Sequence, residues 1–530
     1  MNVLKSYVSP TRISQPASLK GKAGRHLAGT SIKRLVRVFV AWKLLLLLAA
    51  CASPGSGYDT STQILFDQSR SGSGSHSWLA RAFEYVVLRL TRWDGIYFAT
   101  AADRGHIYEQ QWAFSWLMSK FSALVARVLF STFSLSPIAK HALAGILISH
   151  LSHFFAVTTI YRLIYTLAPA NDARKRQLAF ITACLHTVSP AGLFLSAPYG
   201  EATFALFNFL GLLCYVTAIQ NRFERYADAY QVDAFWTLAA GMWFALATMV
   251  RSNGLLSGIL FAWDALATVP RLNNLIRNRD AEELVRLSAT LVAGTVMIIG
   301  FAIPQSIAYA EYCIPTATRP WCSAFPPSIY TFVQSHYWNV GFLRYWTVPN
   351  IPLFALAFPL GWIMVETAIP SFFQAHHINR AVNGSCEADR KLQPYPPLPV
   401  TSEERVFQYM LPRLALPQVV LVGLAATTSH CQILNRISSG YPLWYFIIAL
   451  EVCLNNGYGA GWSEDNSVAE RERLRRGEGR RQQKQQRDGM FRLMGDYDRL
   501  PWAKPEWIVR GMMVYAVVQG GLFASFLPPA

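Results

Sequence analysis

The sequence predicts an all-α polytopic membrane protein with roughly 9–12 transmembrane helices. Of its 530 residues, 52% are hydrophobic and 15% are charged, whereas soluble domains carry about 25% charged residues. Apolar runs close to the roughly 20 residues that cross a bilayer recur along the chain. Lysine and arginine are concentrated between these runs, where they act as orientation signals. The same distribution argues against a nucleic-acid partner, despite a net charge of +17.

The predicted spans follow one another along most of the chain. The first apolar run contains the Leu44–Leu48 block behind a basic leader, which favours a retained signal anchor over a cleaved signal peptide. Segment 113–134 carries Lys120 and Arg127, so it is predicted as either an interfacial helix or a further span. The predicted spans are 34–53, 138–167, 178–197, 201–220, 234–250, 254–269, 287–310, 351–373, 414–437, 441–456 and 507–528.

The basic residues also predict an orientation for the chain. Cytosolic loops of membrane proteins carry an excess of lysine and arginine, and the first 37 residues are strongly basic and contain no acid. Alternation then predicts two long lumenal loops, 54–112 and 311–350. The predicted organisation is a basic cytosolic leader (1–33), a multi-span membrane domain (34–456), a charged cytosolic loop (457–506) and a C-terminal transmembrane helix (507–530).

The eight cysteines include no CxxC pair, so a metal site of the zinc type is not predicted. Cys313 and Cys322 lie nine residues apart in the second predicted lumenal loop. In an oxidising compartment these two could form a disulfide, and free thiols are the open alternative.

Three polar segments stand at the ends of apolar runs and are predicted to meet at one membrane face. The first contains Trp93, Asp94 and Tyr97, and is followed in the same loop by Asp103 and Glu109. Aromatic residues are common at membrane interfaces, which explains part of this pattern. The alternative is a carbohydrate site, in which the rings stack on a sugar and a carboxylate removes a hydroxyl proton as general base.

The second and third segments add a helix break and a cation. Tyr199 and Glu201 surround a Pro-Gly interruption that frees backbone groups, and Arg251 is followed closely by Asn253. Glu201 also suits the first turn of a helix, and Arg251 could simply mark the end of a span. A lumenal arginine opposes the usual charge bias, however, so we expect an anionic partner such as a phosphate, which a guanidinium can bind with two N–H groups.

Several motifs occur in an order that is specific in combination. They are RWDGIYF at 92–98, YE at 108–109 with WAF at 112–114, SPA at 189–191 leading to PYGE at 198–201, RSNG at 251–254, SHYWNVGFL at 335–343, the stretch 430–436 and SSGYPLWY at 438–445. Together they resemble the glycosylphosphatidylinositol (GPI) mannosyltransferase 2 family. The family carries a serine where this chain has Gly200, which argues against a role for a hydroxyl group at that position.

This resemblance implies a GT-C type glycosyltransferase of the endoplasmic reticulum membrane, with domain 34–456 as the catalytic domain and a lumenal active site. The donor would be dolichyl-phosphate-mannose. The acceptor would be mannosyl-glucosaminyl-(acyl)phosphatidylinositol, which receives the second mannose in an α-1,6 bond. Because the donor is β-linked, transfer inverts the anomeric centre and needs one general base. Neither a cofactor nor a metal is expected, and a small accessory membrane subunit is a candidate partner.

The resemblance also assigns roles to individual residues. Asp94 is the first candidate for the base, followed by Glu109 and then Asp103. Arg251 is the candidate for the donor phosphate, with His336 as a weaker alternative. The remaining candidates for contact with sugar or lipid are Trp93, Tyr97, Tyr199, Glu201, Asn253 and Trp338.

Three other functions remain open from the sequence. The first is another GT-C glycosyltransferase that uses a different dolichyl-phosphate sugar or acceptor. The second is a lipid transporter, which is disfavoured because transporters are often built from repeats and the interruptions here lie at one face. The third is a noncatalytic membrane subunit of the endoplasmic reticulum. P-loop, HExxH and GxSxG motifs are absent, which argues against the corresponding soluble-enzyme mechanisms.

Overall fold

The computed structural model describes residues 17–55, 59–69, 78–224, 229–314, 319–383, 400–455 and 504–527. Within these ranges the regular structure is entirely helical. Residues 1–16 of the predicted leader and most of the predicted charged loop 457–506 lie outside the described residues.

The first half of the chain alternates long helices with short helical elements. Side-chain caps explain several helix starts: Ser115, Ser136 and Asn171 each accept a backbone N–H of the first turn. The elements are α1 (Ala17–Ala52), α2 (Ser61–Gln68), α3 (Trp78–Leu90), α4 (Gly95–Arg104), η1 (Glu109–Ala113), α5 (Trp116–Leu129), α6 (Pro137–Leu167), α7 (Asp172–Thr187), η2 (Gly192–Leu195), α8 (Glu201–Glu224) and α9 (Ala229–Val250).

The second half repeats the alternation of long helices with short, irregular connections. Helix α17 begins with a full capping box, in which Thr401 and Glu404 each satisfy a backbone N–H of the other. The elements are η3 (Ser252–Ser257), α10 (Gly258–Thr268), η4 (Val269–Arg271), α11 (Leu272–Asn278), α12 (Ala281–Tyr312), η5 (Pro320–Ser323), α13 (Ile329–His336), η6 (Val348–Asn350), α14 (Ile351–Phe373), α15 (Ala375–Asn383), α17 (Ser402–Thr427), η7 (Cys431–Ile433), α18 (Leu434–Ile437), η8 (Ser438–Gly440), α19 (Leu443–Asn455) and α22 (Pro505–Ala524).

Nine helices among the described residues are long and apolar enough to cross a membrane. A tenth candidate is the pair Cys431–Gly440 and Leu443–Asn455, whose axes are bent by 75°. The all-α polytopic prediction is therefore confirmed, at the lower end of the predicted range. The nine are Ser31–Ala52, Pro137–Leu167, Glu201–Glu224, Tyr230–Val250, Ser252–Asn278, Ala281–Tyr312, Val348–Phe373, Ser402–Thr427 and Pro505–Ala524.

The prediction of one continuous span over 178–197 is wrong. Helix α7 begins earlier, has 16 residues and ends at Thr187, and the chain then turns through η2. Pro190 explains the end of the helix, because proline lacks the N–H that would continue it and disfavours helical geometry in the residue before it. The freed carbonyl of Leu195 accepts a hydrogen bond from Lys43 Nζ at 2.8 Å, so the break is stabilised inside the protein.

The predicted run 414–437 also differs from the structure. Helix α17 begins at Ser402 and ends at Thr427, although it contains two prolines, and the segment after it is a chain of short turns. The residues that follow the break include His430, Gln432, Asn435 and Arg436, so the predicted run extended too far into a polar segment. Segment 113–134 contains the 14-residue helix α5, which is not among the membrane-length helices.

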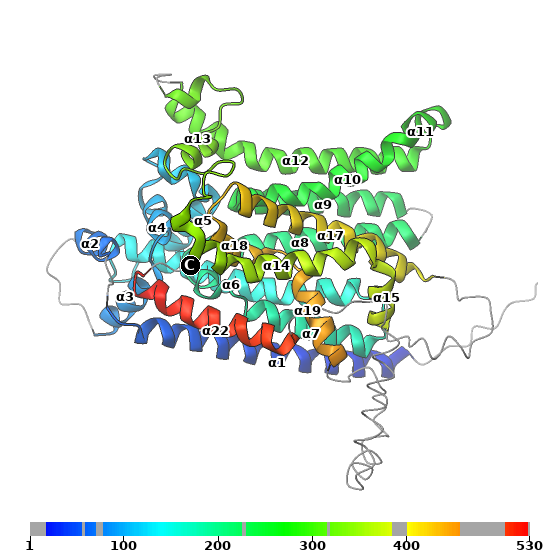
Figure 1. Ribbon diagram of the computed structural model, residues 1–530, viewed down its shortest axis with the longest axis horizontal. Helices are drawn as coiled ribbons and strands as arrows, with labels where there is room; N and C mark the ends of the chain where they lie inside the picture. The colour runs from blue at the N-terminus through cyan, green and yellow to red at the C-terminus, as the bar shows by residue number, and fades with distance from the viewer. Residues whose placement is uncertain are drawn as a thin grey trace, which may run out of the picture.

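Figure 1 shows the long helices lying roughly parallel, with α1 and α22 along one edge and α12 along the other. Helices α8 and α9 form the centre, and α6, α12 and α17 pack around them. Short elements, among them α2, α3, α4 and α13, gather at one end of this bundle. Loops from distant parts of the sequence therefore meet at that end.

A buried ionic network ties the helices together near the start of α9, far along the chain from Val250. Asp264 accepts hydrogen bonds from the Arg413 guanidinium at 2.8 Å and from the hydroxyls of Tyr215 and Tyr409 at 2.6 Å each. Asp233 pairs with Arg222 and Arg286, at 3.0 Å in both cases. Since these carboxylates are each satisfied by cations and hydroxyls, the network is a structural joint rather than an open site.

Candidate active site

A cavity of about 530 Å³ opens among α4, η1, η3, α12, α13 and α18. Its lining includes three charged side chains, Asp94, Arg251 and Arg436. It also includes a set of aromatic rings, namely Trp93, Phe98, Trp112, Phe114, Trp116, Phe194, Phe301, Tyr330 and Trp338. Apolar walls with a few converging polar groups are the usual composition of a ligand site.

Arg436 joins two carboxylates that come from different segments. Its Nη1 donates to Asp94 Oδ2 at 2.9 Å, while Nε and Nη2 donate to Glu201 Oε1 at 3.0 and 2.8 Å. The planar guanidinium suits this arrangement because its N–H groups point in fixed, divergent directions. It also lies over the rings of Phe194 and Tyr199, with the central carbon 4.2 and 5.0 Å from their centroids.

Glu201 is the hub of the charged network. Its side chain is fully buried, and Oε1 also accepts from Arg251 Nη1 at 2.8 Å. One carboxylate oxygen therefore serves two guanidinium groups, whereas Oε2 is buried without a hydrogen-bond partner. Asp94, Glu201 and Arg251 belong to the three segments predicted to meet, and these contacts confirm that prediction.

Asp94 differs from Glu201 in its exposure. About a third of the Asp94 side chain (34%) is accessible, against 0% for Glu201. Asp94 stands immediately before α4, and Trp93 before it adopts a left-handed φ of +53°. Such a conformation is costly for a large residue, so the surrounding packing must hold it. Here it places Trp93 against Phe526, with ring centroids 5.2 Å apart, next to the Asp94 carboxylate in the cavity lining.

Aromatic side chains of residues 97–114 and of Trp338 pack on one another and form what we call the aromatic wall. Tyr97 stacks on Phe114 with centroids 4.6 Å apart, and Phe114 meets Trp338 edge-on at 5.6 Å. Partial burial and, secondarily, the Asp94 carboxylate raise the pKa of the Tyr97 hydroxyl. Tyr97 is therefore a neutral phenol at physiological pH and is unsuited to act as a base.

The predicted site residues fall into three groups. Trp93, Asp94, Arg251 and Trp338 line the cavity. A second group supports the lining from behind: Tyr199 donates to the Arg92 carbonyl at 2.9 Å, Asn253 Nδ2 donates to Tyr441 Oη at 3.3 Å, and Tyr97 and Glu201 make the contacts described above.

The third group of predicted residues does not line the cavity. Asp103 is exposed near the end of α4 and pairs with His141 at 3.4 Å. Glu109 is buried and accepts hydrogen bonds from Trp321 and Tyr337. His336 is exposed and stacks on Phe332. Among the described residues, no group of three or more His, Cys, Asp and Glu side chains is placed to hold a metal ion.

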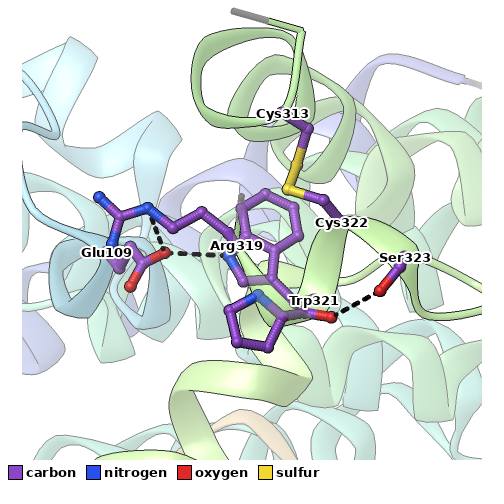
Figure 2. Close-up of a disulfide and its surroundings, with 7 residues drawn as sticks. Glu109, Cys313, Arg319, Trp321, Cys322 and Ser323 are labelled. Atoms are coloured by element: carbon purple, nitrogen blue, oxygen red, sulfur yellow. Dashed lines mark hydrogen bonds and ion pairs between the residues drawn. A yellow bond between two sulfur atoms is a disulfide. The ribbon is translucent and has the colours of Figure 1, made fainter. Parts of the chain in front are cut away.

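Of the two states that the sequence left open for Cys313 and Cys322, the structure has the disulfide, at the end of α12 (Figure 2). The sequence argument gave no role to Arg436, although this residue ends the stretch 430–436 that belongs to the family resemblance. Its signal was available, because an arginine inside the apolar run 414–437 is an intramembrane charge that needs a partner. The sequence did not show that this partner is the Asp94–Glu201 pair.

Gly254 fixes the position of the Arg251 turn. A Cβ at this position would lie 2.7 Å from both Cα and N of Thr248, a cavity-lining residue, so no side chain fits without moving the backbone. We expect Gly254→Ala to destabilise the protein by about 1–3 kcal/mol, the usual cost of overpacking. Thermal unfolding in detergent measures this effect.

Gly423→Ala is the matched control for that substitution, because a Cβ there meets nothing within 4 Å. It should leave the unfolding temperature unchanged or slightly raised, since alanine favours a helix interior. Equal losses in both variants would contradict the close-packing explanation for Gly254.

A charged and aromatic cavity at one end of a bundle of membrane-length helices defines a multi-span membrane protein with a candidate ligand site. Residues 32–530 match the family model described as Mannosyltransferase (PIG-V), and the chain belongs to that family. The class is therefore a membrane-embedded glycosyltransferase.

Curated relatives carry the name GPI mannosyltransferase 2. The protein from Aspergillus fumigatus is 34% identical over 505 residues, which cover 94% of this chain and 93% of that protein. The Aspergillus oryzae and Chaetomium globosum proteins are each 35% identical and cover 94% of this chain and 96% of theirs. Among solved structures, an oligosaccharyltransferase from Archaeoglobus fulgidus superposes with a TM-score of 0.44 at 10% identity, and the chain spans about half (55%) of its length.

Proposed function

We propose that this protein transfers the second mannose of the GPI anchor, in an α-1,6 bond, from dolichyl-phosphate-mannose to mannosyl-glucosaminyl-(acyl)phosphatidylinositol. The family and the names of the curated relatives support GPI-anchor mannosyl transfer. The proposal includes a GT-C type organisation, a location in the endoplasmic reticulum membrane and a cavity that faces the lumen. It requires no cofactor, and a small accessory membrane subunit is included as a partner.

The observation that carries the mechanism is the position of Asp94. Among the described residues that line the cavity, Asp94 is the one carboxylate. Glu201 is fully buried behind Arg436, and neither Asp103 nor Glu109 belongs to the lining. A general base must come within hydrogen-bond reach of the proton that it removes, which favours Asp94 over the other three.

The proposed reaction is a single displacement. Asp94 takes the proton of the acceptor hydroxyl while that oxygen attacks the anomeric carbon of the mannose. The bond between this carbon and the phosphate oxygen breaks, and dolichyl phosphate leaves with the electron pair. Attack from the face opposite the leaving group converts the β-linked donor into an α-linked product. The aromatic wall offers flat surfaces on which sugar rings stack, and it excludes water that would compete with the acceptor.

Arg251 is the proposed contact for the donor phosphate. It lines the cavity, and although Nη1 is bound to Glu201, Nε is buried without a hydrogen-bond partner. An unpaired buried donor is costly, and a phosphate oxygen would satisfy it. Arg436 stands across Glu201 from Arg251, so the two guanidinium groups together would balance the negative charge of the leaving group.

We expect Arg251→Ala to raise the apparent KM for dolichyl-phosphate-mannose by about 10- to 100-fold, the usual value of a hydrogen bond to a charged group. The measurement is initial rate against donor concentration with purified protein. Arg277→Ala is the control, because this arginine is exposed on α11 and outside the lining. An unchanged donor KM in Arg251→Ala would remove Arg251 from the phosphate site.

The function itself is tested by incubating the purified protein with dolichyl-phosphate-mannose and a one-mannose GPI precursor. We expect a two-mannose product whose new bond is α-1,6 by linkage analysis. Transfer at a different linkage or to a different acceptor would identify another GT-C transferase. Movement of the lipid across the vesicle membrane without mannosyl transfer would identify a transporter. If this protein shows neither activity and another subunit transfers the mannose in its absence, this chain has a noncatalytic role.

A further inference from the structure

Glu109 lies in a small core of its own beside the cavity. It is the first residue of η1 and its side chain is 8% exposed. Its Oε1 accepts a hydrogen bond from Trp321 Nε1 at 3.0 Å, and the same oxygen is 3.7 Å from Arg319 Nε. Figure 2 shows the Glu109 carboxylate facing these two residues, with the Cys313–Cys322 disulfide close to the Trp321 ring. The Glu109 Oε1 atom therefore interacts with two residues that do not line the cavity.

The disulfide holds the element that carries Trp321, and a second partner of Glu109 comes from further along the chain. The bond joins the end of α12 to η5, which carries Trp321, and the Trp321 side chain is 2% exposed. Glu109 Oε2 accepts a second hydrogen bond, from Tyr337 Oη at 3.2 Å, immediately after α13. One carboxylate thus connects η1 to both ends of the segment that contains α13.

Residues 319–338 form what we call the cap, and they belong to the cavity wall. Tyr330, Gln334 and Trp338 of the cap line the cavity. Trp112, three residues after Glu109 in η1, also lines it and packs in one apolar cluster with Trp321, Ile329 and Val333. Moving η1 relative to the cap would therefore change the aromatic wall directly.

The cap has further attachments around the cavity. Tyr330 and Ser252 share a hydrogen bond between their hydroxyls at 2.6 Å, and the Trp338 carbonyl lies 3.0 Å from His430 Nε2. These contacts link the cap to the segments that carry Arg251 and Arg436. Glu109 differs from them because its carboxylate is buried, and a buried carboxylate deprived of its donors is costly. Loss of the Trp321 or Tyr337 contact should therefore loosen the cap rather than leave it in place.

We propose that Glu109 is a positioning residue that fixes the cap over the cavity, so that it sets how tightly the cavity holds its sugar-bearing substrate and not how fast the bond is made. The kinetic part of this inference rests on the proposed function. It assigns to Glu109 a role different from that of a general base, and the two roles predict different results for the same variants.

The kinetic test compares Glu109→Ala, Glu109→Gln and Trp321→Phe. Glutamine keeps an acceptor for the Trp321 indole and an amide for the Tyr337 hydroxyl, so Glu109→Gln should behave nearly as the wild type. Glu109→Ala and Trp321→Phe should each raise KM about tenfold, with kcat within about threefold of the wild type. Trp346→Phe is the matched control, because its indole N–H donates to the Ala426 carbonyl outside the cap. A loss of kcat in Glu109→Gln, together with normal kinetics in Trp321→Phe, would overturn the proposal in favour of a base.

A second measurement does not depend on activity. Amide hydrogen exchange of α13 reports local opening of the cap. We expect faster exchange over residues 329–336 in Glu109→Ala and Trp321→Phe than in the wild type, Glu109→Gln and Trp346→Phe. Equal protection in all five proteins would overturn the cap proposal. If the wild type transfers no mannose, the proposed function fails, while the exchange data still decide whether Glu109 holds the cap.

Discussion

Asp94→Asn is expected to lower kcat by about 10²- to 10⁴-fold, the usual contribution of a general base. The amide has the same shape as the carboxylate but cannot take the proton of the acceptor hydroxyl. About a third of the Asp94 side chain is exposed, and Arg436 keeps its contacts with Glu201, so the variant should remain folded. Mannosyl transfer by the purified variant, compared at equal amounts of monodisperse protein, measures the effect.

Asp103→Asn is the matched control for this substitution. The residue lies on α4, nine positions after Asp94, but it is exposed, pairs with His141 and does not line the cavity. We expect its turnover to stay within about twofold of the wild type, as for most surface changes. Near-normal turnover in Asp94→Asn would exclude Asp94 as the base, and inactivation by Asp103→Asn alone would move the base to the exposed end of α4.

Arg436→Ala is expected to affect stability and activity together. It removes three N–H donors at once, which leaves Glu201 with Arg251 as its remaining cation and frees Asp94. Breaking a buried ion pair by removing one partner costs roughly 3–5 kcal/mol, and the remaining Arg251 should keep the loss near the lower end. Arg436→Lys should recover part of the stability but little of the activity, since an ammonium group cannot bridge both carboxylates as the guanidinium does.

The reason for the instability can be separated from the loss of activity. In the double variant Glu201→Gln/Arg436→Ala, Arg251 also loses the carboxylate with which it pairs. We expect this protein to unfold at a lower temperature than Arg436→Ala and to be equally inactive. Arg176→Ala, which breaks the pair with the exposed Asp172 on α7, should change the unfolding temperature little. A double variant as stable as Arg436→Ala, or more stable, would show that the network does not stabilise through its charges.

Much of the fold could be predicted because the bilayer constrains sequence strongly. Most runs near the length of a span became helices, and the departures lie where a proline or a polar segment breaks a run. Run 178–197 looked continuous because hydropathy averages over its break, whereas Pro190 and the Lys43 contact with Leu195 show where the helix is interrupted. Hydropathy reports the environment of a segment and not its continuity.

The candidate site could be predicted in part. The alternation of spans was enough to bring the segments of Asp94, Glu201 and Arg251 to one membrane face, and the structure confirms their contact. In the sequence, Glu109 and Asp94 look alike, because each is an acidic residue among aromatic residues in the first predicted lumenal loop. Their side chains point to different partners, and one-dimensional spacing carries no information about that direction.

The sequence by itself determined that this is a helical membrane protein and to which family it belongs, because hydrocarbon burial and the family motifs are both properties of local sequence. The tertiary structure alone decided which charges share a partner. Arg436 reaches Asp94 and Glu201 across 342 and 235 residues, and Glu109 turns away to Trp321 across 212. Such contacts depend on how helices pack and rotate against one another, so they become visible only when the bundle is assembled.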